Sequence, residues 1–277
     1  MNSPKEIAQN YTAIGTAKTK LPVSKMLVLG ILAGMFIAVA GVASTIASAT
    51  LTDSVGKLIG AAVFPGGLAM VLLAGSELFT GNTIIVLPVC CKQATVGGML
   101  KNWVFVYIGN FIGSLLIAAL VVYGGTFGLF DNLAGGAAIN TAVAKVTMTF
   151  DDAFIRGILC NFLVCIAVWI SFAAKDVVGK VAGIFFPIMM FVLLGWEHSI
   201  ANMYYISAGL LAAGNEAYLA ASKYAADISA LTWGSFFVKN LLPVTLGNIV
   251  GGSVLVGLGY WFIYARDEMK AKADCKQ

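Results

Sequence analysis

Charged side chains are scarce in this chain of 277 residues: they make up 11% of it, while 60% of the residues are hydrophobic. An ordinary soluble domain has roughly 25% charged residues, so this composition excludes a soluble globular protein and indicates an integral membrane protein. The five cysteines form no CxxC pair and no metal-ligand spacing. We interpret them as small apolar side chains and expect neither a metal nor a cofactor; they are Cys90, Cys91, Cys160, Cys165 and Cys275.

An apolar core of the signal-peptide type is also absent from residues 1–25, so we expect no cleaved signal. Ile7, Tyr11 and Ile14 lie on one face of a possible short helix in this segment. We expect a cytoplasmic amphipathic helix on the membrane surface, with a cover over a pore as the alternative. The net charge of +4 comes from loops and tails and indicates no nucleic-acid partner.

The gaps between the few charged residues outline the membrane spans. No charge lies within residues 26–52, 102–130, 157–174 or 240–265, and each gap can cross a bilayer, which takes about 20 apolar residues. Two further apolar stretches, 58–91 and 181–215, are each interrupted near the middle by a polar motif. The sequence therefore predicts an all-α membrane domain with six transmembrane helices over residues 26–265, of which the second and fifth are broken. Residues 266–277 are expected to form a cytoplasmic tail.

The polar motif of the second span recurs in outline in the fifth. The first copy reads Glu77-Leu-Phe-Thr-Gly-Asn82 and the second reads Glu197-His-Ser-Ile-Ala-Asn202. A nine-residue spacing from lysine to asparagine follows each motif, at Lys101–Asn110 and at Lys239–Asn248. Such self-similarity indicates two diverged copies of one unit.

The two copies are expected to be inverted in the membrane, because each contains an odd number of spans. They cover about residues 26–130 and 153–265. Twelve of the 17 Lys and Arg residues fall on the side that both termini share, which leaves five on the other. By the positive-inside rule, the sequence predicts a multi-pass protein of the inner (plasma) membrane with both termini in the cytoplasm.

Each broken span is too long for one straight helix. Residues 58–91 would form a helix of about 50 Å, whereas the hydrocarbon core is about 30 Å thick. A break frees backbone groups that lipid cannot satisfy, so it is tolerated only where protein or a water-filled path surrounds it. Matching breaks in inverted copies are typical of a transport site near the midplane.

Three ionisable groups lie inside the broken spans, namely Glu77, Glu197 and His198. An unpaired carboxylate there costs about 3 kcal/mol, so these groups are expected to face partners. We interpret each carboxylate as a cap for the freed backbone N–H groups, with proton transfer as the alternative. His198, the only histidine, is replaced by Leu78 in the first copy, and this asymmetry favours a role in the pore over an ordinary buried histidine.

Lys145 is the one basic residue within residues 131–150, between the third and fourth spans. It is an ordinary loop lysine if this segment stays at the surface. If the segment folds back towards the breaks, Lys145 becomes a positive charge that attracts anions.

These motifs, together with the segment Lys239-Asn-Leu-Leu-Pro-Val-Thr-Leu-Gly-Asn248, resemble the signatures of the formate/nitrite transporter family, and most closely its bacterial formate channels. The resemblance covers residues 5–267. It implies an aquaporin-like protomer with six spans and broken second and fifth spans. It also implies a homopentamer in the lipid bilayer, in which each protomer has its own pore.

The resemblance also implies roles for individual residues. The central histidine falls on His198, the polar loop threonine on Thr80 and the basic vestibule residue on Lys145, while Asn161 and Asn248 take the place of pore asparagines. Glu77 stands where some formate channels have aspartate. The expected apolar constrictions are Phe64, Leu68, Leu78, Phe79, Val164 and Phe191.

The implied function is passive or proton-coupled transport of a small weak-acid anion, with formate first and nitrite, hydrosulfide, acetate or lactate as alternatives. His198 either hands a proton to the anion or stays neutral and hydrogen-bonds to it. A neutral-solute pore is the competing class; the missing Asn-Pro-Ala pair and the presence of Lys145 and His198 oppose it. We expect no enzyme, because the sequence lacks a metal cluster, a nucleotide loop and a nucleophile with a base.

Overall fold

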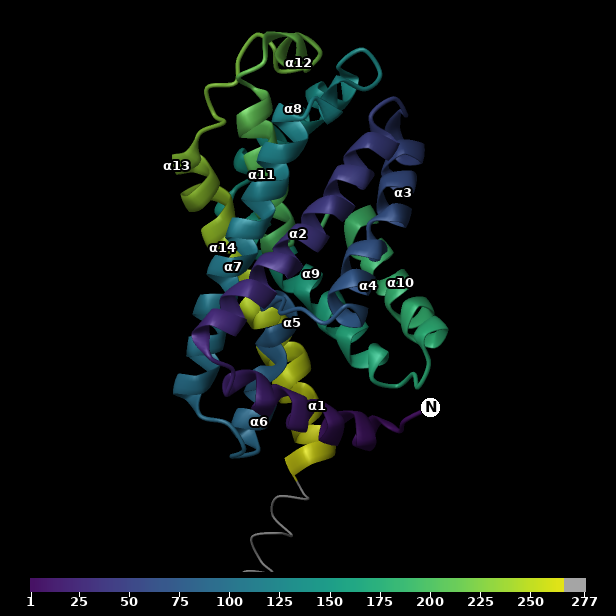
Figure 1. Ribbon diagram of the computed structural model, residues 1–277, viewed down its shortest axis with the longest axis vertical. Helices are drawn as coiled ribbons and strands as arrows, with labels where there is room; N and C mark the ends of the chain where they lie inside the picture. Colours follow the sequence, from purple (N-terminus) through teal and green to yellow (C-terminus); the bar gives the residue numbers. More distant parts are fainter. Residues whose placement is uncertain (267–277) are drawn as a thin grey trace, which may run out of the picture.

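The computed structural model describes residues 1–266, and this part of the chain contains helices, turns and loops but no strand. Figure 1 shows the helices aligned mainly along the long axis, with α1 (Pro4–Thr19) lying across one end. The opposite end carries α8 (Leu133–Val146) and α12 (Glu216–Ala220). The tail expected at residues 266–277 lies outside the described residues except for Arg266.

Long apolar helices form the body of the molecule, as the lack of charge predicts. Within the described residues, five helical segments are long and apolar enough to cross a membrane. Three of them are single α-helices: α2 (Val23–Ser48), α7 (Val96–Tyr123) and α9 (Phe150–Ser171). The fourth joins α3 (Asp53–Val63) to α4 (Pro65–Leu73). The fifth runs from Trp233 to Ala265 through α13 (Trp233–Ser235), η3 (Phe236–Leu241), α14 (Leu242–Ile249), η4 (Val250–Leu258) and η5 (Trp261–Ala265).

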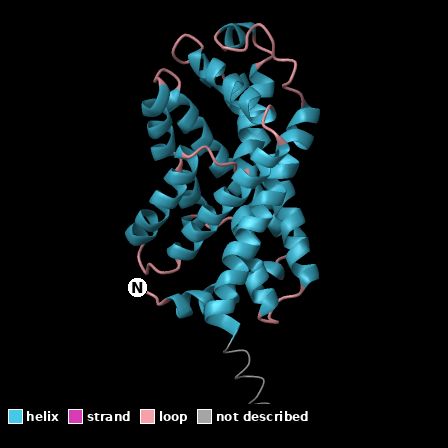
Figure 2. Cartoon of the chain, turned by 180° about the vertical axis from the view of Figure 1, so that it is seen from behind, coloured by secondary structure: helices cyan, strands magenta, loops and turns pink. Residues whose placement is uncertain are grey.

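The remaining span is made of two shorter helices, α10 (Val177–Leu193) and α11 (Ser199–Ala212). The chain leaves helical geometry between them, as it does between α4 and α5 (Phe79–Asn82). After α5 the chain continues through η1 (Thr83–Ile85) and α6 (Val86–Cys90), and η2 (Thr126–Gly128) follows α7. Loop segments at mid-height of the molecule are visible in Figure 2. The second and fifth spans are therefore broken, as the sequence predicted.

Glycines bring helices of each repeat into backbone contact. A Cβ atom on Gly34 of α2 would collide with the Asn110 carbonyl oxygen of α7, and one on Gly113 would collide with the Ile31 carbonyl oxygen. In the second repeat, Gly247 of α14 lies against the Phe154 carbonyl oxygen of α9 in the same manner. Small residues at helix interfaces are a common packing device in membranes, where close van der Waals contact replaces the hydrophobic driving force.

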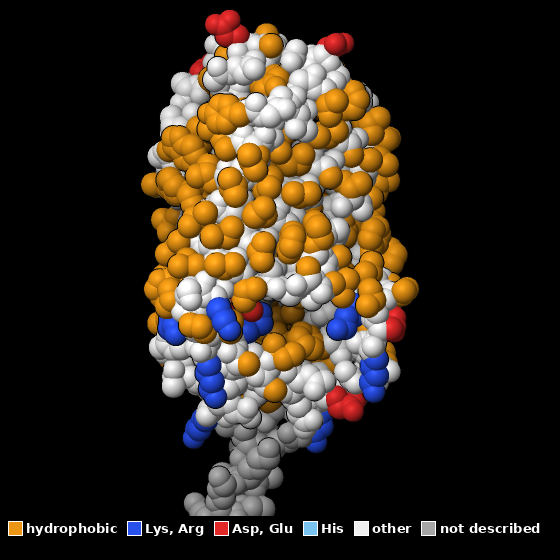
Figure 3. Space-filling model, in the orientation of Figure 1, with side chains coloured by type: hydrophobic (Ala, Val, Ile, Leu, Met, Phe, Trp, Pro, Cys, Tyr) orange, Lys and Arg blue, Asp and Glu red, His pale blue; other side chains and the backbone are white. Residues whose placement is uncertain are grey.

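The surface shows an apolar belt between two polar ends. On the face drawn in Figure 3, hydrophobic side chains cover the upper and middle parts. Lys and Arg gather at the end that carries α1, together with some acidic side chains, whereas the charged side chains seen at the opposite end are acidic. The same face is hollowed just below the belt. These features, with the all-helical fold, confirm the prediction of a multi-pass membrane protein.

Candidate functional site

The first helix break is held by Asn110 of α7. Its Oδ1 accepts a hydrogen bond from the Phe79 backbone N–H at 2.9 Å, at the start of α5. Its amide nitrogen donates to the backbone carbonyls of Gly30 at 2.7 Å and Glu77 at 2.9 Å. One fully buried side chain thus satisfies three backbone groups that lipid cannot satisfy.

Asn248 of α14 repeats this arrangement at the second break. Its Oδ1 accepts from the Ser199 backbone N–H at 2.9 Å, and its amide nitrogen donates to the carbonyls of Gly157 at 2.8 Å and Glu197 at 3.0 Å. The expectation that the carboxylates cap the breaks is wrong for these N–H groups, since a neutral amide supplies both a donor and an acceptor. The resemblance implied a pore asparagine, but Asn248 caps the second break and does not line either of the two cavities described below.

The two carboxylates instead form buried ion pairs. Glu77 Oε1 lies 2.9 Å from Lys18 Nζ, and Glu197 Oε1 lies 2.7 Å from Lys145 Nζ. The second oxygen of each carboxylate accepts from the asparagine that closes its motif, Asn82 or Asn202, at 2.6 Å in both copies. The segment that carries Lys145 does fold back towards the break, which was one of the two possibilities left by the sequence.

A second asparagine completes each network. The amide nitrogen of Asn82 donates to Asn102 Oδ1 at 2.9 Å, and Asn102 in turn donates to the Lys18 carbonyl at 3.3 Å. In the other repeat, Asn202 donates to Asn240 Oδ1 at 2.8 Å and Asn240 donates to the Lys145 carbonyl at 2.9 Å. The structural repeat therefore begins earlier than residues 26 and 153, since it includes α1 and α8.

Lys18 is a functional candidate that the sequence reasoning missed. The signal was present, because Lys18 precedes Gly30 by 12 residues and Lys145 precedes Gly157 by the same 12. Treating residues 1–25 as a separate segment hid this match. Helix α1 in fact packs on the broken span: Ile7 and Tyr11 are buried, and the Tyr11 hydroxyl donates to the Gly81 carbonyl at 3.1 Å.

Two cavities approach the breaks from opposite ends of the molecule. The α8-side cavity, of about 270 Å³, is lined by Lys57, Lys145, Glu197, His198, Phe64 and Phe191 among others. The α1-side cavity, of about 520 Å³, is lined by residues that include Tyr11, Lys18, Glu77, Lys180, Leu68 and Leu78. Each ion pair therefore borders one cavity.

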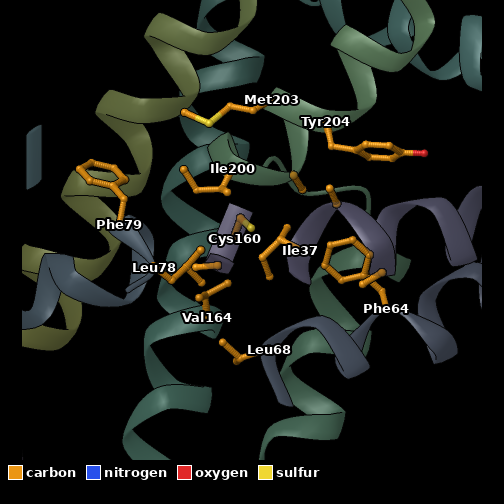
Figure 4. Close-up of a cluster of buried hydrophobic side chains, with 14 of the residues drawn as sticks. Ile37, Phe64, Leu68, Leu78, Phe79, Cys160, Val164, Ile200, Met203 and Tyr204 are labelled. Carbon is orange, nitrogen blue, oxygen red and sulfur yellow. The ribbon is translucent and has the colours of Figure 1, made fainter. Parts of the chain in front are cut away.

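Apolar side chains separate the cavities. Phe64 and Phe191 meet edge to face, with ring centroids 5.7 Å apart, at the α8-side cavity. Leu68 and Leu78 line the α1-side cavity, and Figure 4 shows them and Val164 pointing toward one another. We call these five side chains the barrier. The structure thus brings together five of the six residues expected at constrictions, and all five are at most 3% exposed.

Phe79 is the exception, and its expected place in the constriction is not where the structure puts it. Its ring points away from the Leu68 and Val164 cluster (Figure 4) and packs against Tyr107, with centroids 4.8 Å apart, and against Trp103. Consecutive residues at a helix start point in different directions, so only one of Leu78 and Phe79 can face the barrier. Phe79 instead borders an apolar groove on α7 and the last span.

His198 and Thr80 place polar atoms beside the barrier. His198 Nε2 lies 2.9 Å from Thr80 Oγ1, and the His198 ring stacks on Phe191 with centroids 5.7 Å apart. The Ala201 backbone N–H donates to His198 Nδ1 at 3.0 Å, so the imidazole is the N-cap of α11. Because Nδ1 accepts, the proton of the neutral ring is on Nε2, which donates to Thr80 and leaves the Thr80 hydroxyl hydrogen for another acceptor.

Asn161 holds the break from the α9 side. Its amide nitrogen lies within hydrogen-bonding distance of the Asn248 carbonyl at 2.6 Å, Thr83 Oγ1 at 3.0 Å and the Thr80 carbonyl at 3.2 Å. The side chain is fully buried and borders neither cavity. This position indicates that Asn161 holds Thr80 in place and does not itself contact a permeating solute.

Comparisons with known proteins agree with this architecture. A sequence model of the family described as "Formate/nitrite transporter" matches residues 5–262. The "Probable formate transporter" of Methanothermobacter thermautotrophicus is 38% identical over 284 residues, which cover 96% of this chain and 98% of the relative. The "Formate channel FocA" of Escherichia coli K12 is 39% identical over 90% of this chain and 89% of its own. A solved "Pentameric formate channel with formate bound" matches with a TM-score of 0.79 and 35% identity, over 87% of this chain and 97% of that one.

The Lys145–Glu197 pair predicts a marked difference between single and double substitutions. Lys145→Met leaves a carboxylate that is 2% exposed without its cation, and should lower the free energy of unfolding by about 3 kcal/mol. Lys145→Met with Glu197→Gln removes both charges and should recover most of that loss. The measurement is thermal unfolding of the purified protein in detergent. A double variant as unstable as Lys145→Met would show that the ion pair does not explain the effect.

Proposed function

Because the chain belongs to the formate/nitrite transporter family, we propose that it carries small monovalent weak-acid anions, formate first among them, across the membrane. The observation that carries this proposal is the arrangement of the two cavities. Each contains lysine beside a buried glutamate, and apolar side chains lie between the two. Its family and its neighbours are transporters or channels, and we infer that the protein is not an enzyme.

The barrier favours a neutral form of the solute. A carboxylate that leaves water for the space between Phe64, Phe191, Leu68 and Leu78 loses its hydration, so its protonated form becomes preferred there. A small weak acid meets this condition by taking up one proton before it crosses. Formate is the smallest carboxylate and therefore needs the least displacement of these buried side chains.

His198 is proposed to act as a neutral hydrogen-bond donor. A protonated imidazole would carry hydrogen on both nitrogens, and Nδ1 would then lose the bond from the Ala201 N–H that caps α11. The proton that neutralises formate therefore comes from a hydronium ion of the solution that reaches the cavity, which becomes water, and not from an imidazolium. The Thr80 hydroxyl, oriented by His198 Nε2, is the group that meets the passing acid.

Formate flux into proteoliposomes tests this function, with internal pH and current recorded together. We expect the vesicle lumen to acidify with little current, because one proton accompanies each formate. Uptake of formate, nitrite and hydrosulfide is compared at two external pH values, and faster uptake of nitrite or hydrosulfide would move the assignment to that anion within the family. Formate carried as pure current at every pH would show that the anion itself crosses.

Two substitutions of His198 separate transport from folding. His198→Phe and His198→Asn both remove the donor to Thr80, and each should lower formate flux at least about tenfold if that hydrogen bond is worth roughly 1.5 kcal/mol to the crossing acid. Asparagine is a good N-cap, so His198→Asn should keep the thermal stability that His198→Phe loses. Wild-type flux in His198→Asn would remove His198 from the permeation step.

We also propose a homopentamer in which each protomer has its own pore. Five complete sets of cavities would then lie side by side, and the outward apolar side chains of α2, α7 and the last span would face neighbours or lipid. The measurement is the mass of the protein solubilised in a mild detergent, determined by native mass spectrometry. A mass of one or four protomers would contradict this proposal.

The proposed location is the plasma membrane, with the α1 end in the cytoplasm. The support is the gathering of basic side chains at that end (Figure 3) and the positive-inside rule. A C-terminal fusion to green fluorescent protein should fluoresce, and a fusion to alkaline phosphatase should stay inactive. The reverse pattern would invert the assignment of the two cavities.

A further inference from the structure

The two cavities share the same set of charged side chains. Within the described residues, each cavity is lined by two lysines and one glutamate. In both, one lysine is bound to the glutamate and the other is not. The bound lysines are Lys145 on the α8 side and Lys18 on the α1 side; the unbound ones are Lys57 and Lys180, respectively.

A bound lysine offers an approaching anion little net attraction. Lys145 Nζ lies 2.7 Å from Glu197 Oε1, and the side chains are 14% and 2% exposed. Seen from several ångströms away, such a pair is a dipole, and its field falls off faster than that of a single charge. Lys145 was expected to draw anions inward by its charge. A lysine without an ion-pair partner fits that role better.

Lys57 is the second lysine of the α8-side cavity, and no ion pair of the described side chains involves it. It is exposed on α3, and no carboxylate lies within 4.0 Å of its Nζ among the side chains that the structure describes. A Cβ atom placed on Gly195 would lie 3.5 Å from Lys57 Nζ. The side chain therefore reaches towards the loop that leads into Glu197, and does not extend away from the cavity.

Lys180 holds the matching place at the α1-side cavity. It lies in the first turn of α10, is half-buried, and likewise has no described carboxylate within 4.0 Å. The nearby Asp176 carboxylate is occupied as the N-cap of α10, where its Oδ1 accepts from the Gly179 N–H at 2.7 Å. The Lys180 ammonium is therefore not held in an ion pair by any carboxylate that the structure describes.

The inverted repeat accounts for the distribution of these two lysines. Lys57 lies near the start of the helix that leads into the first break, and Lys180 lies near the start of the helix that leads into the second. Because the copies are inverted, these helices start at opposite ends of the molecule. Lys57 precedes Glu77 by 20 residues and Lys180 precedes Glu197 by 17, so the two lysines lie about one helical turn apart in the repeat unit. Corresponding helices of the two copies thus each provide one lysine to a different cavity.

We propose that Lys57 recruits the anion to the α8-side cavity, which is the outer one, and that Lys180 recruits it to the α1-side cavity, which is the inner one. The deeper lysines, which are bound to glutamate, position the anion without adding net charge. This inference rests on the proposed transport of a monovalent anion. Each cavity carries a formal charge of +1 from two lysines and one glutamate, with His198 neutral. That excess matches one monovalent anion.

One-sided changes of ionic strength test the proposal. Raising the salt from about 0.01 M to about 0.15 M shortens the Debye length from about 30 Å to about 8 Å, and so screens charges on the treated face. Choline gluconate serves as the salt, with sucrose to balance osmolarity, and initial formate uptake is measured well below saturation. Right-side-out vesicles expose the outer cavity to the bath, and inside-out vesicles expose the inner one.

In right-side-out vesicles, added bath salt should slow wild-type uptake severalfold. Lys57→Gln should lower uptake at low salt by about threefold or more and abolish most of the salt response, since electrostatic steering can change association rates by about tenfold or more. Lys180→Gln should keep the bath response there and lose it in inside-out vesicles. Lys57→Arg should behave as wild type, because it retains the charge.

Lys223→Gln and Lys25→Gln are matched controls, because these lysines are exposed and border neither cavity. Both should keep the wild-type salt response. If Lys57→Gln keeps it too, the inference is wrong, although formate transport stands. If the wild type carries no formate at all, the proposed function fails and this inference fails with it.

Discussion

The whole arrangement depends on how backbone groups are satisfied where two helices are broken inside an apolar medium. An unpaired N–H or carbonyl costs several kcal/mol in hydrocarbon, so a broken span survives only with fixed partners. Asn110 and Asn248 are those partners, and each reaches across from a helix of its own repeat. Their positions require α7 and α14 to lie against α2 and α9, which the glycine contacts allow. The cavities, the ion pairs and the barrier are all placed relative to these caps.

The departures from repeat symmetry occur at the barrier. Leu78 makes no side-chain cap at the start of α5, which ends after four residues and continues as a 3₁₀ turn. His198 caps α11, which continues unbroken for 14 residues. One copy thus contributes an apolar side chain to the barrier, and the other contributes a polar ring that hydrogen-bonds to Thr80 of the first. The polar path across the midplane is therefore shared between the copies, and neither copy has it alone.

Much of the fold could be predicted because its signals are local. Long gaps in charge gave the spans, and the recurrence of Glu77–Asn82 at Glu197–Asn202 gave the repeat and the breaks. The partners of individual side chains were harder to predict. Asn110, 33 residues after Glu77, and Lys18, 59 residues before it, come close to Glu77 only in the folded structure. The same limit applies to Phe79: its neighbour Leu78 has similar chemistry, and only the helix start decides which of them faces the barrier. Lys18 could have been found from the 12-residue spacing it shares with Lys145.

The distribution of charge follows from the cost of burying it. Near the breaks a lone ammonium or carboxylate would be expensive, so Lys18 and Lys145 occur there only with their glutamates. At the cavity mouths water solvates a lysine, and Lys57 and Lys180 can remain unpaired. The five apolar side chains of the barrier carry no charge, and the His198–Thr80 bond lies beside them. A solute moving inward therefore meets a free charge, then a dipole, then a single hydrogen bond, and this order favours an anion that can become neutral over one that cannot.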